Sequence, residues 1–221
     1  MAEAVGTEAT KEVGTPGGPE VRGGLWSFTS FWGLHAWIFA YSFVMLSAFY
    51  IQFAEGEFPC PLCMLQRYGM ILSTAGALFI VMQARRGTLT TARYSQGLGM
   101  GLLGALIGGA EVSVRQILLH INPGDPGYGA PVLGLHLYTW ALITFIIVIA
   151  YCGVRLVLTP LGIPQAPPAG SALWRLSTVI IWIFIAVVAA NVVAIIFLEG
   201  FAWVLPDDPT GYTLIDQLTG S

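Results

Sequence analysis

The sequence predicts an all-α integral membrane protein with five transmembrane helices. Of its 221 residues, 56% are hydrophobic and only 10% are charged, whereas soluble domains usually carry about 25% charged residues. The hydrophobic residues gather in five segments, each long enough to supply the ~20 residues that a helix needs to cross the hydrocarbon core. The net charge of −3 is too small to indicate a nucleic-acid partner.

The chain opens with a polar stretch that is rich in Gly, Glu and Thr. Residues 1–28 hold too few apolar side chains to pay the entropy of folding, so the composition predicts a disordered tail. The stretch also lacks the apolar core of a secretory signal. We therefore expect the first transmembrane helix to direct membrane insertion.

Five apolar segments follow, and they define the expected organisation of the chain. They cover residues 30–53, 61–84, 96–121, 132–158 and 173–205. We expect residues 29–158 to form a four-helix core, 159–172 a linker, 173–205 a fifth helix and 206–221 a tail. The third segment carries Gly97, Gly101, Gly104 and Gly108, a spacing of small residues that lets transmembrane helices pack closely.

Charged residues between the segments indicate how the chain crosses the membrane. Basic residues occur in alternate connections, at Arg85, Arg86, Arg93, Arg155 and Arg175. The opposite connections and the C-terminal tail are acidic, with Glu55, Glu57, Asp125, Asp207, Asp208 and Asp216. Since positive residues stay on the cytoplasmic side, the pattern predicts a cytoplasmic N-terminus and linker. It places Cys60, Cys63 and the C-terminal tail on the extracytoplasmic side.

The motif that carries chemistry is Cys60-x-x-Cys63, at the start of the second segment. No further Cys or His set has zinc-ligand spacing, so no metal is expected, and a metal site would need ligands from a partner subunit. A purely structural disulfide across so short a loop would stabilise the fold little. Because the extracytoplasmic face is oxidising, we favour a reversible redox disulfide.

The position of this pair in the helix favours reactivity. Pro61 suits the first helical position, which places Cys60 near the N-cap and Cys63 in the first turn. Free N–H groups and the helix dipole stabilise a thiolate there. Arg67 follows Cys63 by four residues on the same helix face, and an arginine inside a transmembrane segment is usually functional. The alternative is that Arg67 snorkels to the headgroups.

Electrons that leave a dithiol need an acceptor. The sequence has no flavin or dinucleotide fingerprint, and Met64, not His, follows Cys63, which excludes a haem-attachment motif. A membrane quinone remains as the expected acceptor. Cys63 would react with it while Arg67 stabilises negative charge on the ring oxygen. Cys60, expected to lie nearer to solvent, would exchange with an outside thiol protein.

With Cys60, Cys63 and Arg67 in this order, the chain resembles the DsbB family of disulfide bond formation proteins over roughly residues 33–158. The resemblance implies an oxidase of the bacterial inner membrane that uses ubiquinone or menaquinone. Its partner would be a periplasmic thioredoxin-fold protein of the DsbA type. Cys60 and Cys63 match the redox pair, and Arg67 matches a quinone contact. Gln116 stands where the family often has a quinone-side histidine, and it can donate a hydrogen bond but not carry a proton.

Two departures from the family pattern leave alternatives open. Well-studied members have a second cysteine pair in the second outer loop, but residues 122–131 contain none, and Cys152 is expected near the opposite end of the fourth helix. The fifth helix is also additional. The partner would then exchange directly with Cys60–Cys63, or through a relay in another protein. Alternatively, the chain is a non-catalytic DsbB-like subunit whose fifth helix docks onto a larger membrane assembly.

Three further polar features carry expectations. Glu111 and Arg115 are four residues apart in the third segment, which predicts an ion pair or, alternatively, a proton path to the quinone. Asn191 in the fifth segment predicts an interhelical hydrogen bond. His120 and His136 flank the second outer loop, where they either anchor the interface or take up protons.

Overall fold

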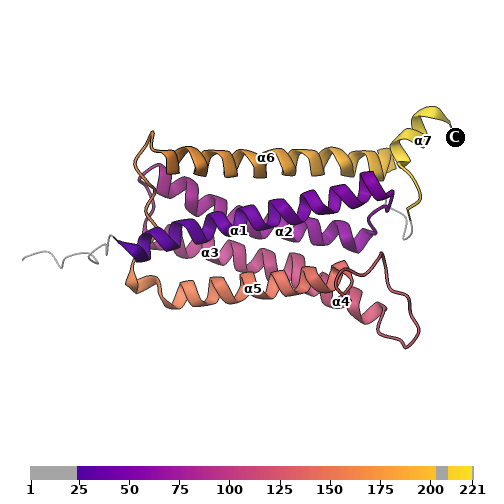
Figure 1. The fold of residues 1–221 in the computed structure, drawn as a ribbon, viewed down its shortest axis with the longest axis horizontal. Helices are drawn as coiled ribbons and strands as arrows, with labels where there is room; N and C mark the ends of the chain where they lie inside the picture. The colour runs from indigo at the N-terminus through magenta and orange to yellow at the C-terminus, as the bar shows by residue number, and fades with distance from the viewer. Residues whose placement is uncertain (1–23, 203–208, 221) are drawn as a thin grey trace, which may run out of the picture.

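The computed structural model describes residues 24–202 and 209–220 of the chain. Five of its helices are long and apolar enough to cross a membrane, and they lie side by side in one elongated bundle (Figure 1). The described part contains no β-strand, only an isolated bridge between Val132 and Leu135. The predicted fold class, an all-α bundle with five membrane-spanning helices, is confirmed.

The spans are built from the following elements, in chain order. The first span is α1 (Leu25–Tyr50), which ends in one π-helical turn, η1 (Ile51–Glu55), and the second is α2 (Pro61–Arg85). The third joins α3 (Thr91–Ala105), the π-helical turn η2 (Leu106–Ala110) and α4 (Glu111–Leu119). The fourth is α5 (Leu137–Val157), followed by the short 3-10 helix η3 (Thr159–Leu161). The fifth is α6 (Ala172–Glu199), followed by the 3-10 turn η4 (Gly200–Ala202) and the short helix α7 (Thr213–Thr219).

The two predicted tails differ from the structure where they can be compared. Residues 1–23 lie outside the described residues, but 25–28 begin α1, so the expected disorder is wrong for these four. Trp26 explains the longer helix: its indole N–H donates to the carbonyl of Gly162 at 3.3 Å, and the Arg155 guanidinium lies 4.4 Å from the centre of its ring. In the C-terminal tail, residues 206–208 and 221 lie outside the described residues, and α7 was not expected.

Helix α2 packs with its backbone in direct contact with α3 and with η2, the turn that continues α3. A Cβ atom at Gly69 would collide with the backbone of Gly108, and one at Gly76 would collide with that of Gly97. Only glycine permits this approach, so the expectation drawn from the glycine spacing is confirmed. The close packing also brings α4, which continues α3, against the start of α2.

The fifth helix belongs to the same bundle because polar contacts attach it to α1 and α2. Ser177 of α6 lies 2.8 Å from Nε2 of buried His35 in α1. Arg85 of α2 donates to the Ser177 hydroxyl at 2.6 Å and to the Thr178 hydroxyl at 2.8 Å. Its guanidinium also stacks on Trp174, 3.8 Å from the ring centre. The additional helix is therefore held by contacts within this chain.

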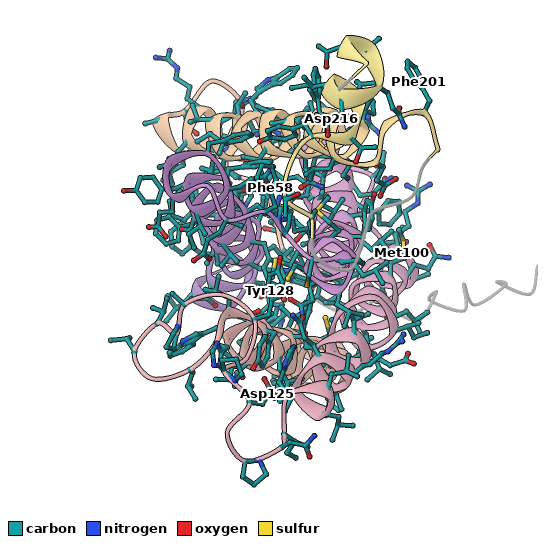
Figure 2. All side chains as sticks on the ribbon, turned by 90° about the vertical axis from the view of Figure 1, so that its right-hand side faces the viewer. Phe58, Met100, Asp125, Tyr128, Phe201 and Asp216 are labelled. Atoms are coloured by element: carbon teal, nitrogen blue, oxygen red, sulfur yellow. The ribbon has the colours of Figure 1, made fainter. Side chains whose placement is uncertain are left out.

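The two ends of the bundle differ in what they gather. One end holds the starts of α1 and α6 together with the turn between α2 and α3. The other, which we call the dithiol end, holds η1, the start of α2, the loop between α4 and α5, and α7 (Figures 1 and 2). The orientation of these ends across the membrane stays a prediction.

Candidate functional site

The cysteine pair opens α2 as predicted. Cys60 is the N-cap residue, and its sulfur accepts the backbone N–H of Cys63 at 3.2 Å. Pro61 occupies the first helical position, where its missing N–H costs no hydrogen bond. Both sulfurs are free thiols. The local sequence thus places two thiols within the first turn of a helix.

The burial of the two thiols differs from expectation. Cys60 is only 6% exposed, whereas Cys63 is partly exposed and lines a cavity. The expectation that Cys60 lies nearer to solvent is wrong. The segment before Cys60 is attached to the loop between α4 and α5, because the hydroxyl of Tyr128 donates a hydrogen bond to the carbonyl of Phe58 at 2.6 Å.

Gln116 of α4 bridges the two sulfurs. Its amide nitrogen lies 3.3 Å from the Cys60 sulfur and 3.6 Å from the Cys63 sulfur. Its amide oxygen accepts the Nε2–H of Gln66 at 2.9 Å, which orients the N–H side of the amide toward the thiols.

Gln116 is 1% exposed and is not among the residues that line the cavity. Its predicted contact with a quinone stays a prediction, whereas its contact with the dithiol is a finding.

Arg67 lies one turn beyond Cys63 and is buried, with 6% of its surface exposed. It donates to the amide oxygen of Gln52 at 3.0 Å, and its guanidinium carbon lies 5.3 Å from the centre of the Phe49 ring. This burial within the protein contradicts the snorkelling alternative. Among the described residues the only ion pair is between His120 and Asp125, so Arg67 is a buried cation with no carboxylate partner.

Gln52 is the residue of this site that the sequence analysis missed. It lies in the π-helical turn η1 at the end of α1 and is 2% exposed. The turn ends at Gly56, whose φ of 73° lies in the left-handed region that glycine adopts readily. A single amide in an otherwise apolar run was the signal that could have found Gln52.

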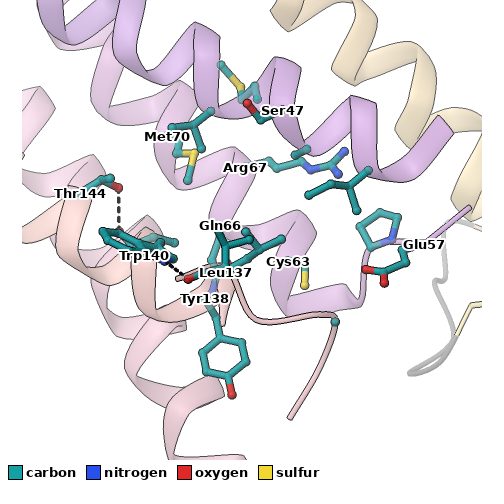
Figure 3. A pocket seen from close by; sticks show the side chains of 18 of the residues that line it. Ser47, Glu57, Cys63, Gln66, Arg67, Met70, Leu137, Tyr138, Trp140 and Thr144 are labelled. Atoms are coloured by element: carbon teal, nitrogen blue, oxygen red, sulfur yellow. Dashed lines mark hydrogen bonds between the residues drawn. The ribbon is translucent and has the colours of Figure 1, made fainter. Parts of the chain in front are cut away.

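A cavity of about 440 Å³ lies between α1, α2, α5 and the loop that precedes α5. Most of its wall is apolar, and Figure 3 shows the side chains of α2 and α5 facing it. Cys63, Gln66 and Arg67 contribute polar atoms from α2, and Arg67 is the only cation among the lining residues. The other polar lining side chains are Ser47, Glu57, Tyr128, Tyr138, Trp140 and Thr144. The cavity is therefore an apolar space whose wall contains one thiol and one positive charge.

The electrostatics distinguish the two thiols. The pKa of the Cys60 thiol is raised above its usual range, chiefly because Cys60 hydrogen-bonds to Cys63 and secondly because burial disfavours its thiolate. Cys60 thus keeps its proton and can donate it to Cys63. When the dithiol loses one proton, the thiolate is therefore Cys63, which lines the cavity.

Two histidines stack around a cavity residue at the dithiol end. The rings of His120 and His136 lie on Tyr138, with centroids 5.7 and 5.2 Å from its ring. His120 also pairs with Asp125 at 3.0 Å. The pKa of Asp125 is lowered, first by the backbone N–H of Gly127 and then by His120. These contacts order the second outer loop beside the cavity, and proton uptake by the histidines stays a prediction.

Two expectations for other polar residues are wrong. Glu111 and Arg115 form no ion pair in the described part of the chain, and both side chains are exposed on the bundle surface. The amide of Asn191 is buried, yet neither its nitrogen nor its oxygen has a hydrogen-bond partner among the described residues.

Cys152, the third cysteine, is fully buried in the apolar core. It lies 15 residues into α5, about 22 Å from the helix start at ~1.5 Å per residue.

The family comparison matches the part of the chain that contains the dithiol, Arg67 and Gln116. The family model DsbB, described as disulfide bond formation protein DsbB, matches residues 29–128. Disulfide bond formation protein B of Cupriavidus metallidurans is 41% identical over 83 residues, 37% of this chain and 47% of that protein. The protein of the same name from Chromobacterium violaceum is 41% identical over 78 residues, 35% of this chain and 44% of that protein.

A longer match extends over most of a third relative. Disulfide bond formation protein B 1 of Pseudomonas fluorescens is 30% identical over 142 residues, which cover 52% of this chain and 79% of that protein. The chain spans a little under half the length of the first two relatives, by the shares of 47% and 44%. No solved structure matches the chain.

Proposed function

The chain belongs to the DsbB family of disulfide bond formation proteins, and from that premise we propose that it is a membrane thiol:quinone oxidoreductase. Cys60 and Cys63 would take electrons from a periplasmic thioredoxin-fold partner of the DsbA type. The electrons would pass to ubiquinone or menaquinone in the bacterial inner membrane. The observation that carries the proposal is the cavity where Cys63 meets Arg67, a buried cation with no carboxylate partner in the described residues.

The residues of the cavity fit a quinone. Ligand pockets usually enclose about 300–1,000 Å³ and are mostly apolar with a few placed polar groups, and this cavity of about 440 Å³ is of that kind. Its apolar wall suits a ring and an isoprenoid chain, while Arg67 and Gln66 offer donors to carbonyl oxygens. A quinone bound there would supply the acceptor for two electrons and two protons.

The proposed thiol chemistry balances within the dithiol. A thiolate of the reduced partner attacks the sulfur of Cys60 in the Cys60–Cys63 disulfide, and Cys63 leaves as a thiolate. The second partner thiol then closes the partner's own disulfide and releases Cys60. The chain now holds both thiols reduced, and its disulfide re-forms when two electrons and two protons leave for the acceptor.

Two polar side chains, Gln116 and Arg67, are placed to stabilise the charges that this chemistry requires. The N–H of Gln116 contacts both sulfurs and stabilises negative charge on them. Arg67 stabilises negative charge on Cys63 and charge that develops on an acceptor oxygen. An arginine inside a transmembrane segment is costly and usually functional. An anionic transition state in the cavity explains why such a residue is present.

The loop between α4 and α5 has no second cysteine pair, so this chain cannot relay oxidation through that loop. We propose that the partner exchanges directly with Cys60. Because Cys60 is 6% exposed, the stretch that contains Phe58 has to move before a partner sulfur can reach it. The Tyr128 hydrogen bond to Phe58 is the contact that would have to open.

The test is quinone-coupled oxidation by the purified protein. A reduced DsbA-like protein and a short-chain ubiquinone are mixed with it, and partner thiols and quinone are followed together. We expect one partner disulfide per quinone reduced, loss of the reaction in Cys63→Ala, and full activity in the matched control Cys152→Ser.

The same reaction can be followed in cells. Thiol trapping should find Cys60 and Cys63 oxidised, and quinone starvation should make them accumulate reduced. If the redox state of Cys60 and Cys63 does not change with the quinone supply, the alternative of a non-catalytic DsbB-like subunit is favoured.

A further inference from the structure

We propose that Tyr212, which lies in the segment between α6 and α7, positions the Arg67 guanidinium in the cavity by holding the amide of Gln52. The inference rests on the proposed function, since it concerns how the cavity binds its quinone. Tyr212 would act as a positioning residue, because it is not among the residues that line the cavity.

A chain of two hydrogen bonds links Tyr212 to Arg67. The Nε2 atom of Gln52 lies 3.4 Å from the hydroxyl oxygen of Tyr212, and the Oε1 atom of Gln52 lies 3.0 Å from Nη1 of Arg67. A guanidinium can only donate hydrogen bonds. Gln52 must therefore present its oxygen to Arg67, which leaves its N–H group to be accepted by the phenol oxygen. The donor and acceptor roles along the chain are fixed.

The ring of Tyr212 is held by packing. It meets Phe58 edge-on, with centroids 5.1 Å apart and an interplanar angle of 76°. It also meets Phe197 of α6 at 6.5 Å and 89°. Tyr212 and Phe58 pack on a small apolar cluster, separate from the main core, whose buried members are Met64, Ile195 and Leu198.

This cluster joins the additional C-terminal region to the redox motif. Met64 directly follows Cys63, and Phe58 precedes Cys60 by two residues, whereas Ile195 and Leu198 come from α6. Figure 2 looks onto the dithiol end, where α7, marked by Asp216, lies at the same end of the bundle as Phe58. Tyr212, which follows the fifth helix in the chain, thus reaches the Arg67 site from a distant part of the sequence.

Loss of the Tyr212 hydroxyl would leave a buried donor without an acceptor. Gln52 is 2% exposed, so water cannot easily take over the hydrogen bond to its N–H group. If the amide turned over, two donors would face each other at Arg67. Either outcome disturbs the guanidinium and hence quinone binding, while Cys60 and Cys63 keep their contacts to Gln116.

The test compares Tyr212→Phe, Gln52→Leu and the double variant with the wild-type chain. The first readout is the dissociation constant of a short-chain ubiquinone, from quenching of tryptophan fluorescence, since Trp140 lines the cavity. The second is the rate at which dithiothreitol reduces the Cys60–Cys63 disulfide, which involves no quinone. Tyr50→Phe is the matched control, because Tyr50 is 65% exposed and lies outside the cavity wall.

We expect Tyr212→Phe to raise the quinone dissociation constant about 3- to 10-fold, the effect of one hydrogen bond, and to leave the dithiothreitol rate unchanged. Gln52→Leu should raise it at least as much, and the double variant should match Gln52→Leu alone because Tyr212 acts through Gln52. Tyr50→Phe should behave as wild type.

Three outcomes would overturn the inference. In the first, the wild-type chain binds quinone and Tyr212→Phe binds it equally well. In the second, the effects of Tyr212→Phe and Gln52→Leu multiply in the double variant. The first and second outcomes would overturn the role of Tyr212 without affecting the proposed function. In the third, the wild-type chain exchanges thiols but binds no quinone, which overturns the proposed function together with the inference.

Discussion

The side-chain amide nitrogen of Gln116 lies 3.3 Å from the sulfur of Cys60, across 56 residues of sequence. The same nitrogen reaches Cys63, and Gln66 holds the amide oxygen. A neutral donor thus faces both thiols at the point where α4 meets the start of α2. The dithiol therefore has a hydrogen-bond donor of its own, separate from the cation in the cavity.

Replacing Gln116 by leucine should slow the reaction of Cys63 with iodoacetamide. A hydrogen bond to a charged group contributes about 1.5–3 kcal/mol, which corresponds to about a 10- to 100-fold lower rate if the thiolate loses it. Gln66→Leu, which removes the group that orients the amide but leaves the amide in place, should slow alkylation less. The quinone dissociation constant of Gln116→Leu is measured alongside, and it stays unchanged if the amide serves the dithiol alone. A weaker affinity for quinone with an unchanged alkylation rate would instead assign Gln116 to quinone contact.

Replacing Arg67 by methionine should reduce quinone-dependent turnover about 10²- to 10³-fold, as when a preorganised charge stabiliser is removed from an active site. The melting temperature should stay the same or rise, because methionine replaces a buried cation that has no carboxylate partner in the described residues. Turnover assays and thermal unfolding in detergent measure the two effects. Arg115→Met, at an exposed position of α4, is the control. An equal loss of activity and stability would make Arg67 a structural residue.

Alkylation of Cys60 should require a higher pH than that of an ordinary thiol. The raised pKa of Cys60 means that its thiolate forms only above the usual midpoint near ~8.5. Cys63→Ala removes the hydrogen bond that is the main cause of the shift, so the midpoint should move down while burial keeps part of the elevation. Peptide mass spectrometry after labelling at a series of pH values reports this. Identical profiles in the two proteins would contradict the assignment.

Replacing Tyr128 by phenylalanine should make Cys60 easier to reach. The change removes the 2.6 Å hydrogen bond to the Phe58 carbonyl, and the loss of one such contact should raise Cys60 labelling about 3- to 10-fold. Labelling is measured at fixed pH in the Cys63→Ala background, where only one thiol of the pair remains. Tyr50→Phe serves as the control for a lost hydroxyl. Unchanged labelling would mean that another contact holds the stretch before Cys60.

The local features of the site could be predicted because they depend on near neighbours in the sequence. Pro61 and the helix start define the N-cap position of Cys60, and the four-residue spacing places Arg67 below Cys63 on one face. The partners of these residues could not be predicted. Gln52 and Tyr212 are 160 residues apart, and no periodicity relates them. The same reason explains the wrong expectation about the exposure of Cys60, since its burial depends on distant segments such as α4, from which Gln116 contacts it.

The sequence by itself determined the five membrane spans and the dithiol with its arginine. Backbone groups in a membrane must be satisfied within each helix, so long apolar segments have few alternatives. Only the tertiary structure decided which thiol is buried, which side chains contact Arg67, and how Tyr212 meets the redox motif. Those contacts come from packing between helices, where glycine-mediated approach and single hydrogen bonds between distant residues set the geometry.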